Sequence, residues 1–138
     1  MEQRPVGLTR DAGWQIGVSR TVAADLGAVW DLLVSAEGLA LWLGEGVDVP
    51  LVTGQQYETA AGTVGEVRSL RPYDRVRITW QPADRPQPAT VQIAVRQAAN
   101  GCSVRFHTER LDSSDEREVM RVHWKRVAAE LADIVAGR

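Results

Sequence analysis

Three chemically distinctive residue types are scarce in this chain, which has one cysteine, one phenylalanine and one lysine in 138 residues. A single cysteine, Cys102, excludes an intramolecular disulfide and any multi-cysteine metal site. This scarcity is typical of the reducing cytoplasm, where we expect the protein to act. No apolar run approaches the length of about 20 residues that a membrane span requires. Residues 1–13 also lack the apolar core of a signal peptide.

A strong excess of charge of one sign is also lacking. The 16 Lys and Arg and the 18 Asp and Glu leave a net charge of -2, and the arginines are scattered along the sequence. Nucleic-acid-binding proteins typically carry a basic field, so we expect no nucleic-acid partner. The 44% of hydrophobic and 25% of charged residues are typical of a globular protein. The length predicts one domain, residues 14–138, after a flexible N-terminal leader, residues 1–13.

Alternation of apolar and polar residues predicts an antiparallel sheet. The clearest strand is residues 75–81, in which Val76, Ile78 and Trp80 alternate with polar residues. The pair Asn100-Gly101 predicts a tight hairpin whose two central residues have positive φ. The expected strands are residues 14–22, 47–49, 54–59, 63–70, 75–81, 90–98 and 102–108.

Three helices are predicted from their capping residues and apolar spacing. Asp25 can cap a helix that continues to Leu33, and Ser35 can cap a short helix that ends before Gly44. Ser113 or Ser114 can cap a long C-terminal helix. Its apolar stripe repeats every three or four residues, as Met120, Trp124, Val127, Leu131 and Ile134. A sheet and an amphipathic helix must bury their apolar faces against each other, so we expect an α+β fold.

Several short segments, in this order, carry a resemblance to a known family. They are VWDLL (29–33) with AEGLALWL (36–43), GEV (65–67) with LRPYDRVRITW (70–80), NGCSVRF (100–106), and His123-Trp124 with Leu131. Their order resembles the START-like (SRPBCC) helix-grip superfamily, and within it bacterial proteins similar to the C-terminal domain of the activator of the Hsp90 ATPase. The resemblance implies a curved antiparallel sheet of six or seven strands wrapped around a long C-terminal helix, with two short helices after the first strand.

The resemblance also implies a cavity between the sheet and the C-terminal helix that holds a small lipophilic or aromatic molecule. Tryptophan suits such a site, because its ring packs while its N–H can bind a polar atom. His123, on the flank of the helix, either contributes a hydrogen bond to the cavity or is partly exposed. The expected cavity residues are Leu39 and Leu43 at the rim, with Trp42, Trp80, Val91, Ile93, Phe106, Met120, His123 and Trp124.

Residues for catalysis or metal binding are sparse. His107 is expected to face away from the core, no HExxH motif is present, and Cys102 has no histidine near it in sequence to activate it. The glycine-rich turns lack the lysine of a phosphate-binding loop. Glu45 or Glu66 could reach the cavity mouth, where apolar surroundings would raise the pKa of a carboxyl group. We expect no metal, no cofactor and no catalytic residue.

The sequence leaves three functions open. The first is non-catalytic binding of a small lipophilic or aromatic ligand by a monomer or weak homodimer. The second is a co-chaperone-like interaction with an Hsp90-type ATPase, which needs an exposed patch. The third is an enzyme or resistance protein acting on a polyketide-like or enediyne natural product. Self-sacrifice by such a resistance protein would need a glycine backbone at the cavity, at Gly62, Gly65 or Gly101.

Overall fold

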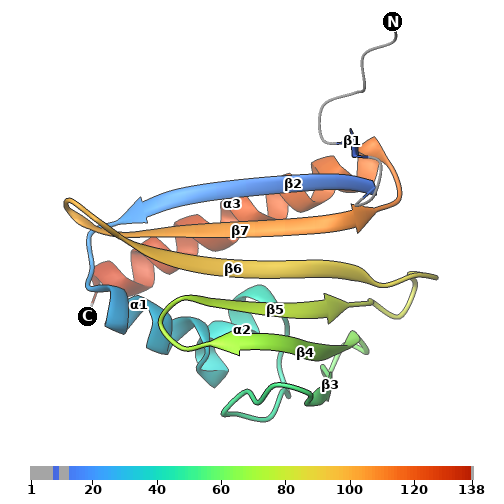
Figure 1. Cartoon of the computed structure of the whole chain (residues 1–138), viewed down its shortest axis with the longest axis horizontal. Helices are drawn as coiled ribbons and strands as arrows, with labels where there is room; N and C mark the ends of the chain where they lie inside the picture. Colours follow the sequence, from blue (N-terminus) through green and yellow to red (C-terminus); the bar gives the residue numbers. More distant parts are fainter. Residues whose placement is uncertain (1–7, 10–12, 138) are drawn as a thin grey trace, which may run out of the picture.

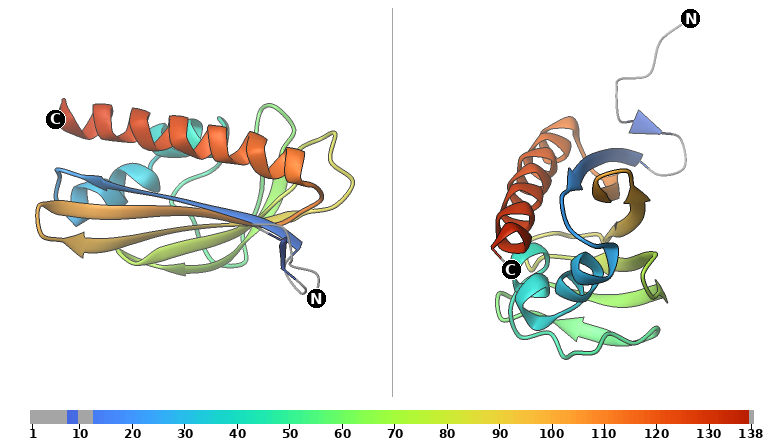
Figure 2. Two further views of the ribbon diagram at one scale, coloured as in Figure 1. Left: turned by 90° about the horizontal axis from the view of Figure 1, so that it is seen from above. Right: turned by 90° about the vertical axis from the view of Figure 1, so that its left-hand side faces the viewer.

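A single curved antiparallel sheet and three helices make up the computed structural model, which describes residues 8–9 and 13–137. In chain order the elements are β1 (Leu8–Thr9), β2 (Gly13–Val22), α1 (Leu26–Leu33), α2 (Ala36–Trp42), β3 (Gln56–Glu58), β4 (Val64–Arg71), β5 (Arg75–Trp80), β6 (Ala89–Ala98), β7 (Gly101–Leu111) and α3 (Ser114–Ala136). The seven strands lie in the order β1-β2-β7-β6-β5-β4-β3 (Figure 1). All three helices lie on one face of the sheet, which we call the inner face (Figure 2). The predicted α+β helix-grip fold is confirmed.

The helices begin where the sequence predicts. The side chains of Asp25, Ser35 and Ser113 each accept a hydrogen bond from a backbone N–H of the first turn that follows, at 3.0, 3.1 and 3.1 Å. These bonds satisfy donors that a helix start otherwise leaves unpaired. Gly38 lets α2 approach α1 closely, because a Cβ there would lie 1.8 Å from the carbonyl oxygen of Leu32.

The core lies between the inner face of the sheet and α3. Side chains of β7 that alternate inward, from Cys102 to Thr108, are 0% exposed. On α3 the buried residues repeat every three or four positions, as predicted, and are Met120, Trp124, Val127, Ala128 and Leu131. Only Ile134, the last residue of the predicted stripe, is half-buried.

The predicted strand at residues 47–49 is wrong, because this segment is part of a loop that follows α2. There, the side chain of Gln55 forms hydrogen bonds with the backbone that a neighbouring strand would otherwise form. Its Oε1 accepts from the N–H of Val52 at 2.9 Å, and its Nε2 donates to the carbonyl of Asp48 at 3.1 Å. The predicted strand at residues 54–59 is shortened to β3 for the same reason, since its first residues belong to this loop.

The β6–β7 hairpin lies where it was predicted, but its turn differs by one residue. Ala98 pairs with Gly101, so the central residues are Ala99 and Asn100, and Asn100 does not have positive φ. Gly101 has φ 145°, and a Cβ there would lie 2.0 Å from the carbonyl oxygen of Val22. Close contact with the end of β2 therefore requires this glycine.

The predicted leader, residues 1–13, falls mostly outside the described residues. Within it, Leu8 and Thr9 pair with Trp14 and Gly13 of β2. Among the described residues, no helix combines the length and the apolar character that crossing a membrane would need.

Candidate functional site

A cleft of about 280 Å³ opens between the end of α2, the start of β4, the end of β5 and the first half of α3. It includes five residues that the sequence predicts for the cavity: Trp42, Leu43, Trp80, Met120 and His123. Thr63 and Val119 complete its lining. The structure therefore brings together predicted residues from α2, β5 and α3 that are far apart in sequence.

The two tryptophans of the cleft are held in different ways. Trp42, at the end of α2, is 3% exposed, and its indole N–H donates to the carbonyl of Leu33 at 2.9 Å. Trp80 ends β5 on the inner face, two residues beyond Ile78, and is half-buried. No hydrogen bond to the Trp80 indole is found within the described part of the chain. Of the two, only Trp80 offers a donor to a ligand.

The other predicted cavity residues lie beneath the cleft in the packed core. Leu39, Val91, Ile93, Phe106 and Trp124 are at most 2% exposed. The rings of Phe106 and Trp124 stack with centroids 5.1 Å apart and planes 16° apart. The indole N–H of Trp124 donates to the hydroxyl of Thr108 at 2.8 Å, so a polar pair is satisfied deep in the core. In this conformation, side chains fill the space between sheet and helix.

His123 lies on the wall of the cleft, where its ring meets that of Trp124 edge-on with centroids 4.6 Å apart. Its Nδ1 is 3.3 Å from a guanidinium nitrogen of Arg126. Burial lowers the pKa of His123, and the charge of Arg126 lowers it further, although a hydrogen bond with the backbone of Trp42 opposes them. His123 is therefore neutral at pH 7 and adds a polar group without adding charge.

The remaining chemical candidates of the sequence lie away from the cleft. Glu45 is exposed, and Glu66 pairs with Arg68 at 3.8 Å. His107 is on the outer face of the sheet, 2.9 Å from the Oε1 of Gln15. Burial raises the pKa of the Cys102 thiol, which disfavours a thiolate. Among residues 8–9 and 13–137, no group of three or more His, Cys, Asp or Glu could hold a metal ion.

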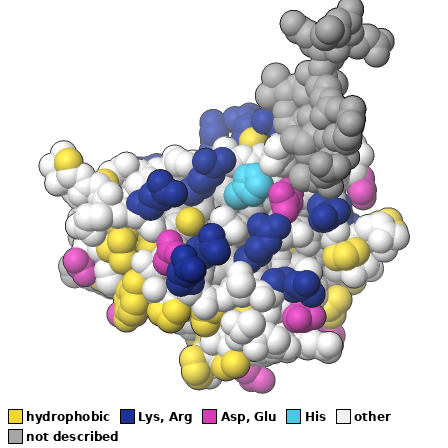
Figure 3. Space-filling view, in the orientation of Figure 1, with side chains coloured by type: hydrophobic (Ala, Val, Ile, Leu, Met, Phe, Trp, Pro, Cys, Tyr) yellow, Lys and Arg dark blue, Asp and Glu magenta, His cyan; other side chains and the backbone are white. Residues whose placement is uncertain are grey.

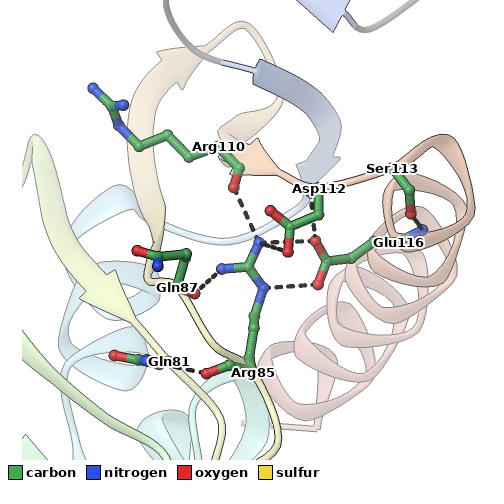
Figure 4. A network of polar contacts seen from close by, with 7 residues as sticks. All are labelled: Gln81, Arg85, Gln87, Arg110, Asp112, Ser113 and Glu116. Atoms are coloured by element: carbon green, nitrogen blue, oxygen red, sulfur yellow. Dashed lines mark hydrogen bonds and ion pairs between the residues drawn. The ribbon is translucent and has the colours of Figure 1, made fainter.

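A buried arginine that the sequence analysis missed fixes the loop between β5 and β6 to the start of α3 (Figure 4). Arg85 is 7% exposed and binds both carboxylate oxygens of Glu116, at 2.7 and 2.9 Å. It also contacts Asp112 at 3.4 Å and donates to the carbonyls of Arg110 and Gln87. This cluster lies one turn before Val119 and Met120 and so positions the helical wall of the cleft.

A larger hollow of about 690 Å³ lies between α1, α2 and the end of α3, away from the predicted cavity. Its lining includes Asp25 and Asp31, which already have structural roles. Asp25 caps α1, and Asp31 accepts from the hydroxyl of Tyr73 at 2.9 Å. These contacts satisfy the carboxylates of Asp25 and Asp31, so neither requires a ligand.

A curved antiparallel sheet closed on one face by a long C-terminal helix, with an apolar cleft at their edge, defines a helix-grip domain. The family model described as Activator of Hsp90 ATPase homolog 1-like protein matches residues 23–136, so the chain belongs to that family. No curated protein sequence matches the chain.

Solved structures support the same fold. Protein MLL2253 from Mesorhizobium loti has a TM-score of 0.75 and 17% identity, covering 88% of this chain and 96% of that one. The Aha1 dimer from Colwellia psychrerythraea has a TM-score of 0.71 and 19% identity, covering 88% and 95%. DynU16, from the dynemicin biosynthetic locus, has a TM-score of 0.76 and 19% identity, covering 86% of this chain and 46% of that one. At these identities the likeness concerns the fold.

Proposed function

We propose that the protein binds a small lipophilic or aromatic molecule in the cleft, without catalysing its conversion. The observation that carries the proposal is the half-buried indole of Trp80, whose N–H has no partner among the described residues, beside Met120 and His123. Ligand sites are typically apolar with a few polar groups that fix orientation. Trp80 and the neutral His123 supply those polar groups.

The size of the cleft limits the ligand. Its volume of about 280 Å³ is near the lower end of the range of about 300–1,000 Å³ for ligand pockets. An aromatic ring that buries about 150–250 Å² gains about 4–6 kcal/mol, equivalent to a Kd between about 1 mM and about 50 μM before other costs. Tighter binding requires the ligand to reach below Met120 to the Phe106–Trp124 stack. Methionine is the side chain best suited to move aside, because it is unbranched and flexible.

A titration with fatty acids, flavonoids and aromatic polyketides, followed by tryptophan fluorescence and amide NMR shifts, tests the proposal. We expect saturable shifts at Trp42, Trp80, Met120 and His123. Trp80→Leu should abolish the ligand-induced change. The control is Trp14, a half-buried tryptophan on β2, and Trp14→Leu should preserve the change. If no compound of the panel moves these signals, the ligand-binding proposal is wrong.

A co-chaperone function is the second candidate, and it is favoured by two exposed side chains. Val119 and Val122 of α3 are 66% and 57% exposed beside the cleft, and the family takes its name from an activator of an ATPase. We would measure the ATPase rate of a purified Hsp90-type protein with and without this chain. Stimulation that is lost in Val122→Ser, which lies outside the cleft lining, while ligand shifts persist, would favour this function.

A natural-product function is the third candidate, raised by the likeness to DynU16 of the dynemicin locus. Gly65 is covered by the side chain of Tyr57, and Gly101 packs on the end of β2. Gly62 precedes the cleft residue Thr63 and is the better placed glycine. Cleavage of the chain at Gly62 on exposure to an enediyne, detected by mass spectrometry, would support a self-sacrifice role.

The proposed setting is the cytoplasm, with the chain as a monomer or weak homodimer. The single cysteine is free and buried, as is typical of reducing compartments. The Colwellia relative is described as a dimer. Sedimentation across a range of protein concentrations would distinguish the two oligomeric states.

A further inference from the structure

Arginines that are scattered in the sequence gather on the outer face of the sheet (Figure 3). No helix covers this face, because α1, α2 and α3 all lie on the other side (Figure 2). The strand register explains the gathering, since directly paired residues point to the same face. Ala94 of β6 pairs with Arg75 of β5 on one side and with Arg105 of β7 on the other, and Arg96 follows two residues along β6.

Arg96 and Arg105 line a hollow, and Arg75 is paired with Ala94 in its floor. Ala94 is the smallest side chain of its row, and the space above it, about 490 Å³, is lined by residues that include Gln92, Arg96, Ser103 and Arg105. Strands lie about 4.8 Å apart, so Arg75 and Arg105 begin about 10 Å apart with Ala94 midway. Arg75 and Arg105 could each reach a group above Ala94 by a change of rotamer, since the guanidinium of Arg105 now lies over Gly17 of β2.

The three arginines differ from their neighbours in having no counter-charge. Arg68, Arg71 and Arg77 each form an ion pair with a carboxylate, of Glu66, Asp74 and Glu109. Within the described part of the chain, Arg75, Arg96 and Arg105 form no ion pair. The guanidinium of Arg105 lies over Gly17 of β2, where a Cβ would be 3.0 Å from it. The positive charge around Ala94 is therefore uncompensated by the protein.

We propose that the hollow over Ala94 binds the phosphoryl group of a phosphate monoester. Arg75, Arg96 and Arg105 supply the charge, and guanidinium groups match phosphate oxygens in paired hydrogen bonds. Ser103 and Gln92 supply further donors at the rim of the hollow. This site is separate from the ligand cleft, which lies on the inner face.

A localised phosphoryl site fits this face better than a nucleic-acid track does. The outward positions of β5, β6 and β7 carry no tryptophan, tyrosine or phenylalanine on which a base could stack. The positive charge is also interrupted by the ion pairs of Arg68, Arg71 and Arg77, whereas a nucleic-acid backbone requires a continuous basic path. The chemistry recognised is one phosphate group with two negative charges.

Amide NMR titration of the whole chain tests the proposal with three probes: inorganic phosphate, a phosphoserine peptide and vesicles that contain phosphatidic acid. We expect saturable shifts at Ala94, Ser103 and Arg105 that chloride at the same ionic strength does not produce. The probe that binds most tightly identifies the source of the phosphoryl group. Arg96→Gln or Arg105→Gln should weaken binding about tenfold, because each removes a charge-assisted hydrogen bond. Arg68→Gln, on the same face but paired with Glu66, is the matched control and should leave the affinity unchanged.

A second variant tests the uncompensated charge itself. Ala94→Glu places a carboxylate among the three arginines, so it should raise the melting temperature relative to Ala94→Gln and abolish the phosphate-induced shifts. Shifts that are equal in Arg105→Gln and the unmodified chain would overturn the proposal, as would a lower melting temperature for Ala94→Glu than for Ala94→Gln. Binding of an oligonucleotide with no response to any phosphate monoester would also overturn it, in favour of nucleic acid.

Discussion

The two faces of the sheet are built from alternate residues of the same strands, yet they have opposite chemistry. On the inner face of β7, Val104 and Phe106 are 0% exposed and packed beneath α3. On the outer face of the same strand, Arg105 is exposed and His107 is half-buried. Because one strand supports both faces, a substitution can test either face while the backbone stays the same.

The comparison of the two faces separates side chains that stabilise the fold from charged side chains that are free to bind a partner. Polar groups deep in the core of the inner face are already satisfied, as in the bond between Trp124 and Thr108. Outer-face arginines around Ala94 have no such partner in the described residues. The segments that resemble the family contribute to both faces, since residues 70–80 and 100–106 carry Ile78 and Phe106 inward but Arg75 and Arg105 outward.

The largest difference between the faces should come from Phe106→Ala. It removes one ring of the stack with Trp124 and leaves a cavity, so the free energy of unfolding should fall by about 3–5 kcal/mol. Arg105→Ala, the adjacent residue on the opposite face, should change it by no more than about 0.5 kcal/mol. Urea unfolding followed by circular dichroism measures both values. Equal losses would mean that the outer face also contributes to stability.

The buried arginine of the loop between β5 and β6 should have the next largest effect. Arg85→Met leaves Glu116 partly buried without its partner and frees the carbonyls of Arg110 and Gln87. Since Glu116 retains some exposure, we expect a loss of about 2–3 kcal/mol. Replacing both members, in Arg85→Met/Glu116→Gln, should recover part of this loss. Denaturant unfolding of the single and double variants checks the coupling, and additive losses would show that the pair acts independently.

The pH dependence of stability should distinguish the two histidines by their environments. Burial lowers the pKa of both His123 and His107 in the folded chain. The unfolded state therefore binds protons first, and stability should fall as the pH decreases from about 6.5 through the lowered pKa values. His123→Gln and His107→Gln should each remove part of this slope. Thermal melts at several pH values measure this change of stability with pH. The affinity of the cleft for its ligand should change only as His123 is protonated.

The smallest effect is expected for an ion pair on the outer face. Arg68 and Glu66 lie 3.8 Å apart, and their side chains are 59% and 38% exposed. Exposed pairs of this kind contribute less than about 1 kcal/mol and are screened by salt. Arg68→Gln should therefore leave the melting temperature almost unchanged in both low and high salt. A clear salt-dependent loss would show that the outer-face charges act as one network.

Features that depend on neighbouring residues were predicted well from the sequence. Asp25, Ser35 and Ser113 cap their helices because a cap needs only the next three residues. Alternation likewise placed Val76, Ile78 and Trp80 on one face. Five of the seven residues that line the cleft were among those predicted, and all of these except His123 were assigned to apolar faces.

Features that depend on distant contacts could not be predicted in this way. Arg85 lies in a proline-rich loop, and its partner Glu116 is 31 positions away. The arginines around Ala94 meet only through the pairing of three strands. Whether the space between sheet and helix is open or filled depends on side-chain volumes summed across the core. The loop at residues 47–49 was mistaken for a strand because a side chain, that of Gln55, binds its backbone.

The contacts of Trp42 determine how the cleft can open. Its indole N–H donates to the carbonyl of Leu33 at the end of α1, and it lines the cleft with His123 of α3. Because this bond is buried, a displacement of Trp42 would break it or require α1 to move with α2. The opposite wall is held through its backbone, since the N–H of Thr63 donates to the hydroxyl of Thr59 at 3.1 Å and Trp80 pairs with Ala89 of β6. A guest molecule should therefore enter by moving side chains, above all the flexible Met120, while the backbone of both walls stays in place.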